Sequence, residues 1–399
     1  MDDRPRPGNG MQSTPPAEVY VAGVGLTPVG EHWNVSLREL ALEAIQAARA
    51  DAGGLRPQAL FAANMLAPAL SGQTHLGVLL ADFAGLRGME ASSFEAAGAS
   101  GGVALRQAYL AVRSGMIDVA LVIGVEKVTD RVGPAVEAAL SMAGDADHEA
   151  VQGLTPATQA GLLMRRYLHE SGAPEDALAG FAVNAHANGL TCEHAFLRRG
   201  ITVEDYRQAP RDDDPLNLFD VAPLADGAAA LLLTRREALS GGDRPGVRVA
   251  GSSVATAATA LHDQADMLGL TAAEESARRA RLQAGVEPDQ ISLFELHDAY
   301  AIFAPLALEA GGFAERGQGW RLAAGGQVGL RGQHPICTFG GSKARGEVGG
   351  ATGVYQAAEV VLQLQGRAGM NQVPGARLGM AQCLGGAGAT AATHILAVE

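Results

Sequence analysis

Cysteine is scarce in this chain of 399 residues, and long apolar runs are missing. The three cysteines, Cys192, Cys337 and Cys383, are odd in number and far apart, which argues against a disulfide framework and excludes a CxxC metal site. No stretch holds 18 consecutive apolar residues, and the first sixteen residues lack the apolar core of a signal peptide. We therefore expect a cytoplasmic protein without a membrane span, in which any functional cysteine is a free thiol.

Basic charge and aromatic side chains are also scarce. The 30 basic residues are outnumbered by 43 acidic ones, and without a cluster of Lys and Arg there is no surface for nucleic acid. Aromatic residues make up 5% of the chain, against 52 glycines, so packing must depend on small side chains and close backbone approach. At roughly 150 residues per domain, the length suits two or three domains.

The order of elements predicted for the first part of the chain recurs later. A β-branched run at 19–24 predicts a buried strand, and Ser36-Leu-Arg-Glu39 is a capping-box pattern that starts a helix reaching about residue 50. Thr271-Ala-Ala-Glu274 has the same pattern, before a helix that Gly285 ends and a strand at 291–296. The repeated order predicts an internal duplication of an α/β unit.

Each half also has a glycine-rich turn that leads into a helix and then into an apolar strand. These segments are the turn at 96–102, the helix at 103–113 and the strand at 119–125, and later the turn at 346–353, the helix at 354–364 and the strand at 378–383. We expect two α/β halves, each a mixed sheet with helices on both faces, and an insertion between them. The predicted boundaries are a flexible tail at 1–17, a first half at 18–128 plus 220–245, an excursion domain at 129–219 with helices at 157–170 and 174–188, and a second half at 246–399.

Five motifs in this order resemble the thiolase superfamily, and more closely its sterol-carrier or lipid-transfer branch. They are EAAGASGGVAL at 95–105, PLNLFDVAPLADGAAALLL at 215–233, HDAY at 297–300, GGSKARGEVGGATG at 340–353 and CLGGAG at 383–388. The resemblance implies a five-layered αβαβα fold, a homodimer, and a coenzyme A thioester that enters beneath the excursion domain. It implies no tightly bound cofactor and no metal, since coenzyme A is part of the substrate.

The resemblance also marks what this chain has lost. It places Gly98 where the family has its acylated cysteine, at the start of a buried helix, and it places Glu347 where the family has the histidine that activates that cysteine. His297 is retained from the HD form of the lipid-transfer branch, and Cys383 and Gly385 match the family's CxG motif. A glycine cannot hold an acyl group, so the two-step exchange that needs a thiolate is lost with it.

The polar groups that remain are His297, Glu347, Cys383, Tyr300 and Asp298. They suit a reaction without an acyl-enzyme, such as retro-aldol cleavage of a β-hydroxyacyl-CoA, with Glu347 or Tyr300 as the base and His297 as the donor to the thioester oxygen. The steroid side-chain aldolases of the lipid-transfer branch resemble thiolases, lack the nucleophile, and work with a small OB-fold and zinc-ribbon partner. The resemblance therefore implies such a partner here.

Two other functions and several structural roles stay open at this stage. Another thiol, most plausibly Cys383, could have taken over the nucleophilic role, or the chain could be a catalytically silent subunit that binds acyl-CoA or a partner enzyme. Glu347 and Asp298 could cap helices, and His297 and Cys383 could be core residues.

Overall fold

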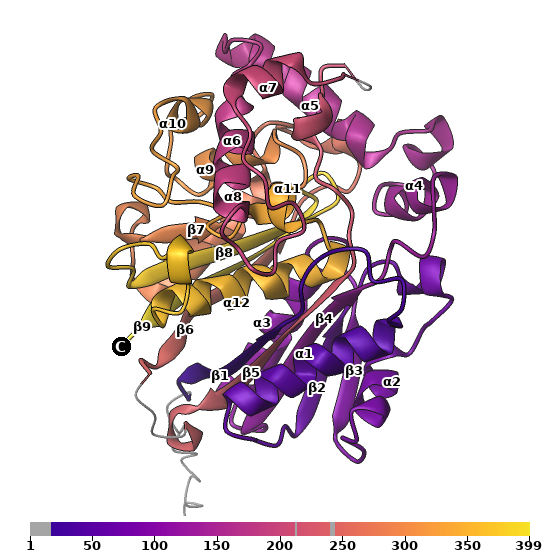
Figure 1. The fold of residues 1–399 in the computed structure, drawn as a ribbon, viewed down its shortest axis with the longest axis vertical. Helices are drawn as coiled ribbons and strands as arrows, with labels where there is room; N and C mark the ends of the chain where they lie inside the picture. Colours follow the sequence, from indigo (N-terminus) through magenta and orange to yellow (C-terminus); the bar gives the residue numbers. More distant parts are fainter. Residues whose placement is uncertain (1–16, 212–213, 240–243) are drawn as a thin grey trace, which may run out of the picture.

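The computed structural model describes residues 17–211, 214–239 and 244–399. The predicted tail therefore lies outside the described residues, except for its last position. The strands form one nine-stranded sheet in the order β3-β2-β4-β5-β1-β6-β9-β8-β7, with five strands from the first half of the chain and four from the second. Among the described residues, two residue pairs, Tyr20 with Arg248 and Val21 with Val247, join the halves of the ladder, so the two halves form two sheets that meet at one corner (Figure 1).

The two halves repeat one topology. The strands β1, β2, β4 and β5 have the same sequential and spatial order as β6, β7, β8 and β9, while β3 is an added edge strand. The first half contains β1 (Val19–Leu26), α1 (Leu37–Asp51), β2 (Ala59–Ala63), α2 (Leu76–Phe83), β3 (Glu90–Phe94), α3 (Ser100–Arg113), β4 (Val119–Glu126) and β5 (Gly227–Arg235). The second contains β6 (Val247–Thr256), α8 (Thr271–Ala284), β7 (Leu293–Glu295), α9 (Phe303–Ala310), α10 (Trp320–Ala324), α11 (Gly341–Arg345), α12 (Thr352–Leu364), β8 (Leu378–Gly385) and β9 (Thr390–Val398).

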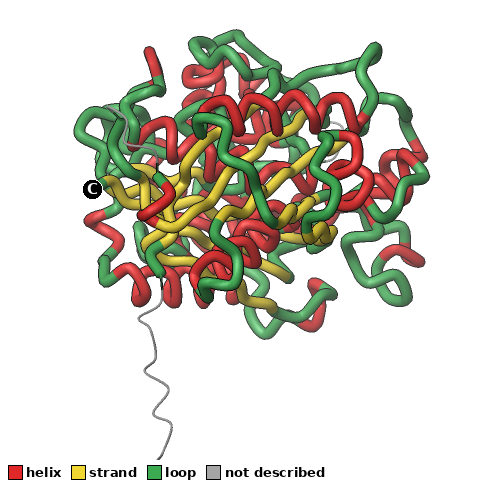
Figure 2. The backbone as a smooth tube through the Cα atoms, turned by 90° about the horizontal axis from the view of Figure 1, so that it is seen from below, coloured by secondary structure: helices red, strands yellow, loops and turns green. Residues whose placement is uncertain are grey.

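The helices complete the five layers expected from the sequence. α1 and α2 pack on the outer face of the first sheet, and α8 and α9 pack on the outer face of the second. α3 and α12 share one apolar core with strands of both halves, so they form the middle layer. In Figure 2 the strands run between helices above and below them. The αβαβα fold class is confirmed.

An excursion between β4 and β5 covers one end of both sheets. It contains α4 (Pro134–Ser141), α5 (Pro156–Ser171), α6 (Ala179–Gly189) and α7 (Val203–Gln208), and Figure 1 shows these helices together above the sheets. The predicted helix at 174–188 begins later than expected, at residue 179, because residues 175–178 form a turn. No helix of the described residues is long and apolar enough to cross a membrane.

The two capping-box predictions have different outcomes. Ser36 caps α1 as expected, since its side chain accepts the Glu39 N–H and Glu39 returns a bond to the Ser36 backbone. The prediction at Thr271 was wrong, because Thr271 is already the first helical residue and Leu270, at φ +41°, is the N-cap without a side-chain bond.

Glycine permits the close packing of helix on strand in both halves. A Cβ atom on Gly23 of β1 would lie 2.3 Å from the Ala48 carbonyl oxygen of α1, and a Cβ on Gly251 of β6 would lie 2.1 Å from the Ala280 oxygen of α8; each glycine follows the register shift of its strand. Real Cβ atoms do not approach that closely, so these positions require glycine. The same contact at equivalent places supports the duplication.

Candidate active site

A cavity of about 220 Å³ lies where strands of both halves end. The segments after β2, β4 and β7, the end of β8, and the turns before α3 and α12 all reach it, and residues of the excursion complete the lining. Carboxyl ends of strands are the usual binding edge of an α/β sheet. Gly98, His297, Tyr300 and Glu347, which the sequence analysis singled out, all line this cavity.

The ring of His297 is held in one orientation beside the cavity. His297 follows β7 and is buried, and its Nδ1 accepts the Leu384 N–H at 2.9 Å. Because Nδ1 is the acceptor, the neutral ring carries its proton on Nε2. Nε2 lies 3.5 Å from Glu347 Oε2, which is longer than an ordinary hydrogen bond. The two groups therefore point toward each other but lie too far apart for an ordinary hydrogen bond.

Glu347 presents a carboxylate oxygen to the same space. Its Oε1 accepts the Thr352 hydroxyl at 2.9 Å, whereas Oε2 has no hydrogen-bond partner within the described part of the chain. Burial opposes ionisation, but the neighbouring His297 outweighs it and holds the pKa of Glu347 below its usual value. The group is thus an ionised, buried carboxylate with one oxygen free to accept a proton.

Gly98 faces this pair from the turn before α3. A Cβ atom at position 98 would lie 2.7 Å from His297 Cε1 and 2.6 Å from the Leu384 carbonyl oxygen, so the imidazole already occupies the space of a side chain. Ala97 has φ +50°, a conformation that is strained for a residue with a side chain. Ser100 supports the turn, since its hydroxyl donates to Ala97 O at 2.6 Å and accepts the Ala96 N–H at 2.8 Å.

Tyr300 and Asp298 have different positions. Tyr300 lines the cavity on a segment whose backbone bonds to the residues before β5, with Ala222 N–H donating to Ala299 O at 2.8 Å. Asp298, which the sequence analysis counted among the polar groups of the site or as a helix cap, is not part of the lining. Its Oδ1 accepts the Ser342 N–H at 2.6 Å, so it caps α11 instead.

The structure does not bring the Cys383 thiol to the cavity. Cys383 is 1% exposed, and a Cβ at Gly102 or Gly353 would lie within 2.7 Å of its sulfur, which places the thiol between α3 and α12. Its neighbours Leu384 and Gly386 line the cavity. Burial raises the pKa of Cys383 to about 12.

Gly385 serves packing, since a Cβ there would lie 2.4 Å from Ala96 O. Among the described residues, no group of His, Cys, Asp and Glu is arranged to hold a metal ion.

Glu126 at the end of β4 is a site residue that the sequence analysis missed. It is fully buried, and its oxygens accept the backbone N–H groups of Met65, Leu66 and Gly350 at 2.9, 3.1 and 2.9 Å and the side-chain amide of Asn64 at 2.8 Å. Met65, Leu66 and Gly349 line the cavity, so this carboxylate fixes two of its walls. Burial raises the pKa of Glu126 to about 7, although the four donors oppose the shift.

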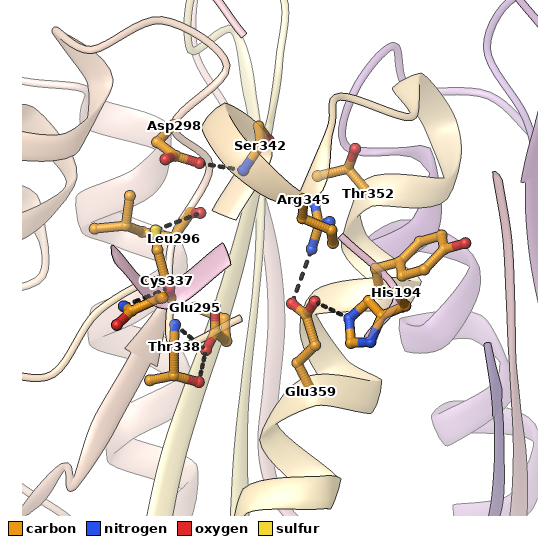
Figure 3. Close-up of polar contacts among 12 residues, drawn as sticks. His194, Glu295, Leu296, Asp298, Cys337, Thr338, Ser342, Arg345, Thr352 and Glu359 are labelled. Carbon is orange, nitrogen blue, oxygen red and sulfur yellow. Dashed lines mark hydrogen bonds and ion pairs between the residues drawn. The ribbon is translucent and has the colours of Figure 1, made fainter. Parts of the chain in front are cut away.

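A buried polar network lies between α12 and its neighbours (Figure 3). Arg345 Nη1 donates to Glu359 Oε2 at 2.8 Å, and His194 Nε2 lies 2.9 Å from Glu359 Oε1. Glu295 accepts both the N–H and the hydroxyl of Thr338. Because His194 belongs to the excursion and Glu359 to α12, the network joins the excursion to the second half.

Both halves of the chain match known family models. Residues 19–237 match the model described as thiolase, N-terminal domain, and residues 253–398 match the one described as thiolase C-terminal domain-like. The chain is 41% identical over 381 residues to an acetyl-CoA acetyltransferase of Methanothermobacter thermautotrophicus, over 95% of this chain and 99% of the relative. It is 27% identical to a steroid side-chain-cleaving aldolase of Thermomonospora curvata, over 87% and 90% of the two chains.

Among solved structures, the Ltp2-ChsH2(DUF35) aldolase superimposes with a TM-score of 0.83 at 24% identity, over 97% of this chain and 99% of that chain. This likeness bears on the fold alone.

Proposed function

Because the chain belongs to the thiolase family, we propose that its cavity binds an acyl-coenzyme A thioester and breaks or forms a carbon–carbon bond without an acyl-cysteine. One observation carries the proposal. His297 and Glu347 lie 3.5 Å apart, and the His297 ring occupies the space that a side chain at position 98 would fill, in a cavity whose described lining contains no cysteine.

The proposed reaction is the retro-aldol cleavage of a β-hydroxyacyl thioester. Glu347 Oε2 takes the proton of the β-hydroxyl group as the bond between the α and β carbons breaks, and the β carbon leaves as an aldehyde or ketone. The electron pair of that bond becomes the thioester enolate, whose oxygen accepts the His297 Nε2–H. The enolate then takes that proton back from the Glu347 carboxyl group at its α carbon, which gives the shorter thioester and restores the carboxylate.

The geometry of the pair suits both roles. At 3.5 Å the His297–Glu347 contact is long enough for each group to bond a substrate oxygen better than it bonds the other. The bond from Leu384 N–H to His297 Nδ1 keeps the proton on the nitrogen that faces the cavity. Tyr300, on the cavity wall, is the alternative base.

The relatives support the proposed reaction and a partner subunit. The Thermomonospora relative is a steroid side-chain-cleaving aldolase and the Ltp2-ChsH2(DUF35) structure is also an aldolase, so we propose retro-aldol chemistry and a second subunit for this chain. We further propose a homodimer, no tightly bound cofactor, and coenzyme A only as part of the substrate.

The test is to incubate the purified protein with β-hydroxyacyl-CoA and β-ketoacyl-CoA thioesters and to follow products and protein mass by mass spectrometry. We expect an aldehyde or ketone plus a shorter thioester, with no mass added to the protein. Added coenzyme A should not change the rate, because no acyl-enzyme waits for a thiol. A parallel set of incubations uses protein that was co-expressed with a candidate second subunit.

Acyl transfer is the second candidate, because 41% identity links this chain to an acetyl-CoA acetyltransferase. It would need the buried Cys383 as its nucleophile. An acyl adduct on Cys383 would therefore replace our proposal with acyl transfer. Tight binding of intact thioesters without turnover, in the presence of the partner, would instead identify a silent subunit.

A further inference from the structure

One wall of the candidate active-site cavity is built against α4 of the excursion. Val136 and Ala139 of α4 belong to a small apolar core with Leu66, Leu70 and Val128. Two members of this core also line the cavity, as do three partly buried residues packed against it; these five are Leu66, Val128, Met65, Leu140 and Leu224. The core that holds α4 in place therefore forms part of the cavity wall.

Glu137 places a carboxylate in this apolar wall. Glu137 and Leu140 both line the cavity, and residues three apart lie on the same face of a helix, so one face of α4 is turned toward the cavity. The Glu137 side chain is exposed, and within the described residues it has no hydrogen bond or ion pair. The described lining contains one other carboxylate, Glu347, and neither Lys nor Arg.

The wall at α4 suits the acyl part of a thioester rather than its coenzyme A part. Phosphate groups are bound by basic side chains, which the described lining of this cavity does not have, whereas a hydrocarbon chain gains free energy against an apolar wall. An acyl group long enough to reach α4 would bring its far end to Glu137. A carboxylate on that end would be repelled by a like charge, with no basic side chain of the described lining to compensate.

We propose that Glu137 is a specificity-determining residue, which makes the cavity select acyl groups with an uncharged far end over acyl groups that end in a carboxylate. The substrates would accordingly be thioesters of monocarboxylic rather than dicarboxylic acids. The inference rests on the proposed binding of acyl-coenzyme A in this cavity, but it does not depend on which reaction follows.

The test is isothermal titration calorimetry of the full-length protein with saturated acyl-CoA thioesters of six, eight, ten and twelve carbons, each with a methyl or a carboxylate end. These thioesters have no β-hydroxyl group, so retro-aldol cleavage cannot occur and the titration measures binding alone. The coenzyme A part is common to both members of a pair and cancels from the ratio of their Kd values. We expect the carboxylate end to weaken binding at the chain lengths that reach α4, and to do so less at high salt, because Glu137 is exposed.

Glu137→Gln should reduce that ratio about fivefold, the effect of removing one of two like charges a few ångströms apart in contact with solvent. In Glu137→Lys the reduction should reach about twenty-fivefold, because attraction replaces repulsion. Part of the ratio should remain in Glu137→Gln, since a carboxylate also loses hydration against an apolar wall.

Glu43→Gln is the matched control, because Glu43 is an exposed residue of α1 that does not line the cavity. It should leave the ratio unchanged. If the methyl-ended thioesters bind but neither Glu137 variant changes the ratio, this inference is overturned and the proposed function stands. Lower stability of Glu137→Gln with an unchanged ratio would show that Glu137 only stabilises the first turn of α4. If none of the thioesters binds, both the inference and the proposed function are overturned.

Discussion

Position 98 shows how one missing side chain determines the chemistry open to its neighbours. The His297 ring and the Leu384 carbonyl oxygen leave no room for a Cβ there. We expect Gly98→Cys to cost about 1–3 kcal/mol of stability, as overpacking usually does, and to show no thiolysis, because Glu347 cannot replace a histidine base. Urea denaturation and a thiolysis assay measure both effects.

The control for this variant is Gly200→Ala, since a Cβ at Gly200 meets nothing within 4 Å. Its stability should stay within about 0.5 kcal/mol of the wild type. Thiolysis by Gly98→Cys at unchanged stability would contradict our account of this position.

Glu347 is the residue on which the proposed proton transfer depends. Glu347→Gln keeps an oxygen for the Thr352 hydroxyl but removes the base, so cleavage should fall by about 10²–10⁴-fold with the fold retained. Thr352→Val is the control variant, since it removes the hydrogen bond between Thr352 and Glu347 but leaves the carboxylate in place. Lost stability with cleavage retained in Glu347→Gln would show that Glu347 is a helix cap.

At the scale of elements, Glu126 joins two loops through four donors. In Glu126→Gln the amide N–H₂ would face backbone N–H groups, and each N–H left unpaired costs about 1–3 kcal/mol. We therefore expect lower stability and weaker acyl-CoA binding, measured by urea denaturation and calorimetry. Glu90→Gln, on the exposed edge strand β3, should change neither, and if both variants behaved alike Glu126 would not anchor the cavity.

Much of this element pattern could be predicted from the sequence, because apolar runs and cap residues are local signals. The runs that became β1, β4, β7 and β8 were expected, but β3 was missed because its sequence, EASSF, is polar and its residues are mostly exposed. Leu270 replaced the expected cap at Thr271 through a left-handed conformation that no sequence pattern announces.

The candidate site was predictable only where a motif carried it. The motifs named His297, Glu347, Tyr300 and Gly98, and the structure brings all four to one cavity. The sequence did not show which way the Cys383 side chain points, because that direction depends on the register of β8 in the sheet. Glu126 was out of reach, because its donors lie about 60 and 224 residues away along the chain.

At the scale of the whole molecule, His194 links the excursion to α12 through Glu359. Burial alone would lower its pKa, but Cys192 and Glu359 outweigh burial and raise the pKa of His194 to about 9, from an ordinary 6.5. The folded state therefore holds a proton that the unfolded chain releases. The stabilisation is complete below about pH 6.5 and is lost as the pH rises through about 9, up to roughly 3 kcal/mol.

Urea denaturation between pH 6 and pH 10 measures this loss. In His194→Gln the part of the pH dependence between 6.5 and 9 should disappear, and in Glu359→Gln it should shrink. A slope in His194→Gln equal to that of the wild type would rule out this residue as its source.

The middle layer affects how the chain folds while the ribosome is still synthesising it. The faces of α3 and α12 that pack on each other and on both sheets belong to segments 239 residues apart, from Arg113 to Thr352. At a synthesis rate of 5–20 residues per second, α3 waits about 10–50 s for its partner. During that interval the nascent first half exposes the apolar surface that α12 later covers, so we expect it to need a chaperone while synthesis continues.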